Sequence, residues 1–365
     1  MKPFAYFLCA LAILLVVLSP RLILSYYEKL PEEPYFEGVL HMWHISGWRT
    51  GGSSTAAFLE NRIRQFEANN PHAFIELASL TPEKASAALR AGEKPDLVSF
   101  PYGQAPALDY EPLPRQSFVL PADTQYAWPY MCGGYCIIVN NDLLSENGVS
   151  APEGWGIRPD ALLETAQHGV VFDAERGYSA LPALALHAYP KAEGLNISTW
   201  GEPEPPDAAL GLSPAAYTDG LNIFCRGEAA VLVASHRQLF EVSERYMQGE
   251  APAFTAYAIG GYTDMAQMIA VTEQEDELRR SACESFAAYL LTPSSQIKLE
   301  ALGVLPTVRN VDIYVENAVM RALYEQLCES GTFAPPDMRQ QLDALAMEMY
   351  GGSALAMHKL RSLLD

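Results

Sequence analysis

Residues 38–100 read GVLHMWHISGWRTGGSSTAAFLENRIRQFEANNPHAFIELASLTPEKASAALRAGEKPDLVSF. Short runs rich in apolar and β-branched residues predict strands at 38–45, 73–78 and 96–100. Between them, apolar residues recur at helical spacing over 56–69 and 82–91. A strand–helix–strand–helix–strand order predicts a parallel sheet with helices on its faces.

The remainder of the chain carries weaker but similar signals. A stretch heavy in Pro, Gly and Ala, residues 151–214, gives no firm secondary structure. Elsewhere, apolar runs and helical periodicity predict strands at 131–140, 229–234 and 265–272, and helices at 273–291, 316–330 and 336–364. With 365 residues, the chain is long enough for two domains.

Charge and cysteine content exclude several classes of function. The formal net charge is 24 − 44 = −20, which argues against binding nucleic acid or adhering to anionic lipid. Of the six cysteines, Cys132 and Cys136 are the only close pair, and we expect small buried thiols rather than a metal site or a disulfide. No metal and no cofactor is expected.

The N-terminus has the pattern of an export signal. Met1 and Lys2 precede an apolar run over residues 4–18, and Arg21 separates this run from a second apolar trio. Residues 1–25 are therefore predicted to be a signal peptide or a signal anchor. The best cleavage point, after Ser25, has the bulky Ile23 at −3, which favours an uncleaved anchor. Residues 26–37, rich in Pro, Glu and Tyr, are predicted to be a spacer.

Seven short motifs, in order along the chain, resemble those of a known family. They are MWH at 42–44, FEANNP at 66–71, AGEKPDLV at 91–98, GYCIIVNNDLL at 134–144, GEAAV at 227–231, YLLTPSSQ at 289–296 and LGVLP at 302–306. On these residues the chain resembles the extracellular solute-binding proteins of bacterial ABC importers, in particular the sugar-binding, maltose-binding-protein-like group. Asn141 stands where the family has a basic residue, and residues between Trp155 and Tyr217 do not match.

The resemblance implies an α/β, two-lobed, periplasmic-binding-protein type 2 fold with hinge crossings, preceded by the N-terminal signal or anchor helix. Lobe 1 is expected over residues 36–126 and 256–309, and lobe 2 over 127–255 and 310–365. The resemblance further implies a monomer that binds a small polar ligand between its lobes, and a carbohydrate is the preferred candidate for this ligand. ABC permease subunits are the implied protein partners. From the N-terminal segment we expect an extracytoplasmic location, at the cell surface or in the periplasm, tethered to the cytoplasmic membrane.

Ligands of open α/β sheets bind beyond the carboxyl ends of the strands, so the candidate residues lie in loops that follow strands. Aromatic rings cover the apolar faces of sugars, and charged or amide groups bind their hydroxyls. Each aromatic has an alternative role in core packing, and Arg237 has one in a surface ion pair. The expected ligand-binding residues are Trp43, His44, Trp48, Arg49, Tyr102, Tyr130, Tyr135, Trp200, Arg237 and Tyr262.

Three functions are open to a chain with these features. The preferred one is the receptor of an ABC importer, and the alternative is a membrane-anchored sensor or scaffold that reuses the same module without transport. An extracellular hydrolase is the third, but no HExxH, GxSxG or phosphate-loop motif occurs. His41 and His44 fall on opposite faces of a strand, which argues against a shared metal. We therefore expect a binding protein and not an enzyme.

Overall fold

A computed structural model describes residues 34–119, 125–150, 170–172, 220–259 and 263–330, with scattered positions between 341 and 359. The predicted signal or anchor, the stretch 173–219 and most of the predicted helix at 336–364 lie outside these residues. Within the described part of the chain, no helix has the length and apolar character needed to cross a membrane. The strands and helices of both sheets belong to one unit, Gly38–Asp365.

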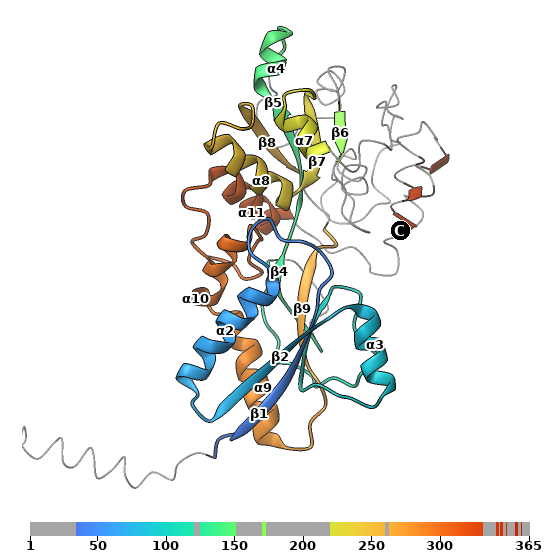
Figure 1. Ribbon diagram of the computed structural model, residues 1–365, viewed down its shortest axis with the longest axis vertical. Coiled ribbons are helices and arrows are strands. Elements are labelled where there is room, and N and C mark those ends of the chain that lie inside the picture. The colour runs from blue at the N-terminus through green and yellow to red at the C-terminus, as the bar shows by residue number, and fades with distance from the viewer. Residues whose placement is uncertain are drawn as a thin grey trace, which may run out of the picture. The chain divides into compact units, whose positions relative to one another are not determined.

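The first sheet has five strands in the order β2-β1-β3-β9-β4. Strand β1 runs parallel to β2 and β3, as predicted, whereas β9 is antiparallel to both β3 and β4. Helices α2 and α9 lie on one side of β1 and β2 and helix α3 on the other (Figure 1). The bounds are β1 Gly38–Ile45, α2 Thr55–Asn69, β2 Ala73–Leu80, α3 Pro82–Arg90, β3 Leu97–Pro101, β4 Trp128–Cys132, β9 Ala266–Val271 and α9 Glu277–Leu290.

The second sheet has four strands in the order β6-β7-β5-β8. Strand β5 is antiparallel to β7 and β8, and β6 is parallel to β7. Strand β8 is not among the strands predicted from the sequence. The bounds are β5 Tyr135–Asn140, α4 Asn141–Glu146, β6 Val170–Phe172, α7 Gly220–Cys225, β7 Val231–Ser235, α8 His236–Met247 and β8 Phe254–Ile259, followed after β9 and α9 by α10 Pro293–Gln296, the 3₁₀ helix η3 Ile297–Leu302 and α11 Ala318–Ser330.

The chain crosses between the two sheets at a pair of glycines. The single strand predicted over residues 131–140 is wrong, because β4 ends at Cys132 in the first sheet and β5 begins at Tyr135 in the second. Gly133 and Gly134 lie between them. A Cβ at Gly133 would lie 2.3 Å from His236, and one at Gly134 would lie 2.9 Å from Leu327. Side chains of α8 and α11 therefore pack directly on the crossing backbone.

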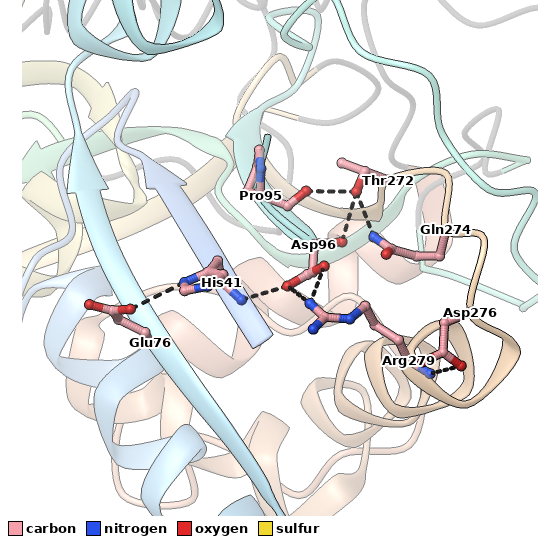
Figure 2. A network of polar contacts seen from close by, with 8 residues as sticks. All are labelled: His41, Glu76, Pro95, Asp96, Thr272, Gln274, Asp276 and Arg279. Atoms are coloured by element: carbon pink, nitrogen blue, oxygen red, sulfur yellow. Dashed lines mark hydrogen bonds and ion pairs between the residues drawn. The ribbon is translucent and has the colours of Figure 1, made fainter. Parts of the chain in front are cut away.

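The carboxylate of Asp96, which lies just before β3, links the elements of lobe 1 to one another (Figure 2). Asp96 accepts a hydrogen bond from the backbone N–H of His41 in β1, at 2.7 Å. Both of its oxygens also lie 2.9 Å from the guanidinium of Arg279 in α9. Beside it, Thr272 donates its hydroxyl to the carbonyl of Pro95 at 2.7 Å. These contacts hold the chain returning through β9 and α9 against β1 and β3.

We predict that Asp96→Ala lowers the free energy of unfolding by about 1.5–3 kcal/mol, the usual loss when hydrogen bonds to a charged group are removed. Urea denaturation followed by circular dichroism measures it. The matched control is Glu76→Ala, which removes an exposed contact to His41 and should change stability by less than about 0.5 kcal/mol. Equal losses in the two variants would contradict the role given to Asp96.

Candidate ligand-binding site

A loop of residues 46–54 follows β1 at its carboxyl end. Backbone hydrogen bonds hold this loop on η3, from Gly52 N–H to the carbonyl of Leu302 at 2.9 Å and from Ser53 N–H to that of Ala301 at 3.1 Å. Trp48 in the loop is only 8% exposed, so its indole is directed into the protein and not into solvent. The loop thus presents one large aromatic ring beyond the end of the first sheet.

Helix α8 begins at the carboxyl end of β7 and presents a histidine. Ser235 and Gln238 form a capping box, which satisfies the first backbone N–H groups of the helix. The N–H of His236 donates to the carbonyl of Gly134 at 2.7 Å. The imidazole of His236 is fully buried against Gly133, where only the absence of a side chain leaves room for it.

These two segments meet, and their contact joins the two sheets. The rings of Trp48 and His236 lie edge to face, with centroids 5.3 Å apart and planes at 88°. One turn further along α8, the ring of Phe240 packs on Gly51 in loop 46–54 and on Gly303 after η3. A Cβ atom added to Gly51 would lie 2.9 Å from this ring, and one added to Gly303 would lie 2.6 Å from it. The carboxyl ends of β1 and β7 therefore face each other through aromatic side chains.

Several buried nitrogens of loop 46–54 and of the first turn of α8 have no hydrogen-bond partner among the described residues. They are Nε1 of Trp48, Nδ1 and Nε2 of His236, and Nε2 of Gln238. Burial, with a smaller effect from Arg237, lowers the pKa of His236 to about 3, so the ring is neutral at pH 7. Buried polar groups are nearly always hydrogen-bonded, so the unpaired nitrogens of these three side chains indicate that another group binds to them. A ligand that offers hydroxyl oxygens would supply the missing acceptors.

Two of the expected site residues lie instead in a polar network inside lobe 1. The hydroxyl of Ser99 in β3 lies 3.1 Å from Nδ1 of His44 and 2.9 Å from the hydroxyl of Tyr130. Gln267 in β9 donates to Ser99 Oγ and to the carbonyl of Ile45, each at 2.9 Å. Burial lowers the pKa of His44 to about 4 and raises that of Tyr130 above its usual range. These polar groups are already engaged within the protein.

The remaining expected residues are spread over several environments. Trp43 is buried in β1, and the hydroxyl of Tyr135 donates to Asp264 at 2.6 Å in the interior. Arg49 is exposed and Tyr102 partly exposed, while Arg237 pairs with Glu241 at 2.8 Å. Trp200 and Tyr262 lie outside the described residues. Of the predicted set, Trp48 makes the contact between loop 46–54 and α8, Arg49 lies in the same loop, and Arg237 follows His236 in α8.

The sequence indicates His236, Arg237 and Gln238 as a polar trio that could bind hydroxyls, but only Arg237 of the three is among the predicted site residues. The available signal was a polar trio placed directly after a buried strand. What selects His236 from this trio is its packing on Gly133 and Trp48, which are far away in sequence.

A pocket of about 440 Å³ lies at the opposite edge of the first sheet, beside the amino end of β3. Asp109, Glu273 and Glu275 line it together with Lys94, and none of the expected ligand-binding residues does. Its lining is mainly acidic and polar, and it is not the candidate site.

No family model matches this chain, and no curated protein matches it either. Solved structures do match. The cyclic α-maltosyl-1,6-maltose binding protein of Arthrobacter globiformis aligns over 90% of this chain and 98% of its own, with a TM-score of 0.63 at 14% identity. The chain has the two-lobed fold of solute-binding proteins.

Other solved structures with this fold also align with nearly the whole chain. The sugar-binding protein MalE of Xanthomonas citri covers 96% of its own length against 90% of this chain, with a TM-score of 0.60 at 14% identity. A chitin oligosaccharide binding protein covers 98% against 90%, with a TM-score of 0.58 at 16% identity. The alignments extend over nearly whole chains, so the likeness is to the complete two-lobed fold.

We predict that Gly303→Ala costs about 1–3 kcal/mol of stability more than Gly92→Ala, which is the typical penalty of overpacking. Both glycines have positive φ, at 66° and 86°, so both substitutions introduce similar backbone strain. Only Gly303 faces Phe240; a Cβ at Gly92 has nothing within 4 Å. Thermal unfolding measures the difference. In a Phe240→Ala background the two substitutions should cost the same, and a persisting difference would contradict the contact.

Proposed function

We propose that this protein is an extracytoplasmic solute-binding receptor that captures a carbohydrate between its two lobes. The observation that carries the proposal is the meeting of Trp48 and His236 beyond the carboxyl ends of β1 and β7. Sheets of this kind bind ligands at that end. Both lobes contribute to the contact, as a protein that closes on its ligand requires.

The chemistry of the contact suits a neutral, hydroxyl-rich ligand. Trp48 offers an aromatic plane for an apolar sugar face and an N–H donor for a hydroxyl. Neutral His236 offers one donor and one acceptor, and Gln238 offers a further donor. We propose that Arg49, Tyr102 and Arg237 contribute to binding around this centre, and Trp200 and Tyr262 stay predictions from the sequence. Trp43, His44, Tyr130 and Tyr135 then support it from within the protein.

Delivery of the ligand to an ABC permease is the preferred cellular role. The N-terminal apolar run supports export and a tether to the membrane, and the net charge of −20 suits a dispersed extracytoplasmic domain. One protein of the same fold is described as an ABC substrate-binding protein from Listeria monocytogenes in complex with cycloalternan. A membrane-anchored sensor is the alternative use of the same module. Recovery of a permease with the protein from its own membrane would support transport, and recovery of a sensor kinase would support sensing.

We predict that an oligosaccharide raises the melting temperature of the full-length protein. A ligand present at about 100 times its Kd stabilises the folded state by about 2.7 kcal/mol, which corresponds to a shift of several degrees. A thermal-shift screen would use maltotriose, chitotriose, monosaccharides, polyols and amino acids. A shift by amino acids alone, or by nothing in the panel, would contradict a carbohydrate ligand.

We further predict that Trp48→Ala weakens binding of the stabilising sugar at least about tenfold, because loss of an aromatic stacking surface costs on the order of 1.4 kcal/mol or more. Titration calorimetry measures the affinity. Tyr246→Ala is the matched control, since this half-exposed aromatic lies near the other end of α8 against Phe254. Unchanged affinity in the Trp48 variant would remove Trp48 from the site.

A further inference from the structure

The imidazole of His236 occupies a position that tolerates only its neutral form. It is completely buried, and neither ring nitrogen has a partner among the described residues. Among the described residues, the contacts at the ring and at Gly133 come from three segments: the indole of Trp48 from loop 46–54, the backbone of Gly133 at the crossing, and Met265, whose sulfur also lies against Gly133. None of these groups is an anion.

The charged groups near the ring do not compensate a proton on it. Arg237, the next residue of α8, is a cation, and it lowers the pKa of His236 further. The carboxylate of Asp264, beside Met265, accepts the hydroxyl proton of Tyr135 at 2.6 Å. The backbone of Gly134 is the one neighbour that raises the pKa of His236, and its effect is smaller than that of burial. A protonated His236 would thus be a buried cation without a counter-charge, which proteins avoid.

The same ring forms part of the contact between the lobes. Trp48 reaches it from the loop after β1, while His236 begins the helix after β7. Phe240 adds the second point of contact at Gly51 and Gly303. Separation of loop 46–54 from α8 would open the ring to water, and water can solvate an imidazolium. Protonation and opening are therefore coupled.

We propose that His236 makes closure of the two lobes pH-dependent: the neutral ring holds loop 46–54 against α8, and protonation in mild acid releases it. The sign follows from linkage. The closed form binds the proton with a pKa of about 3 and the open form with the ordinary value of 6.5. The preference for the closed form is greatest above pH 6.5 and weakens as the pH falls below it. At pH 5 the ratio of open to closed protein rises about 30-fold.

This inference uses the two-lobed module of the proposed function but not its ligand, so it is tested without one. The full-length protein is labelled with 5-fluorotryptophan, and the Trp48 signal in the ¹⁹F spectrum is identified by its absence in Trp48→Phe. Solvent exposure is read from the change in chemical shift between H₂O and D₂O. Trp128, which is 2% exposed in β4 and donates to Pro114, serves as the internal reference for intact lobe 1.

Between pH 7.5 and pH 5.0 the Trp48 signal should change from buried to solvent-exposed while the Trp128 signal stays in place. His236→Phe keeps an aromatic edge against Trp48 but has no titrating nitrogen, so its Trp48 signal should stay buried throughout. His41→Gln, at an exposed histidine, should behave as the parent protein. A Trp48 signal that does not change, the same change in His236→Phe, or a simultaneous change at Trp128 would each overturn the proposal.

Discussion

The carboxylate of Asp96 joins two stretches of chain that are 183 residues apart. The first stretch supplies β1, β2 and β3, and the second supplies β9 and α9. Because β9 lies between β3 and β4, the first sheet is complete only when the second stretch has returned to it. The chain must therefore leave this lobe, build the second sheet and come back, and this constraint sets the positions of the crossings.

The crossings in turn create the candidate site. Gly133 and Gly134 carry the chain from β4 to β5, and their missing side chains let His236 and Leu327 pack on the backbone. His236 then lies where the loop after β1 brings Trp48. The residues that meet across the lobes are thus placed by the topology. Their unpartnered nitrogens are the chemical reason to expect a polar ligand there.

Much of the first lobe could be predicted from the sequence, because β1, α2, β2 and α3 alternate with clear periods and end at Pro71 and Gly92. The break between β4 and β5 was not predicted, although Gly133 and Gly134 interrupt the apolar run, because only tertiary packing shows that the chain changes sheets there. Trp48 was identified from its place after a strand. His236 was not, because its burial depends on Gly133, a residue distant in sequence. The stretch from Trp155 to Tyr217 matched no motif and mostly lies outside the described residues.

The most direct test of a receptor that closes on a carbohydrate is the distance between its lobes. Spin labels placed at exposed positions on α2 and near the end of α8, at Glu60 and Met247, report it by pulsed electron resonance in the full-length protein. Addition of a saturating oligosaccharide should produce a single, narrower distance distribution than the free protein shows. Identical distributions with and without a bound saccharide would contradict ligand capture by closure of the two lobes.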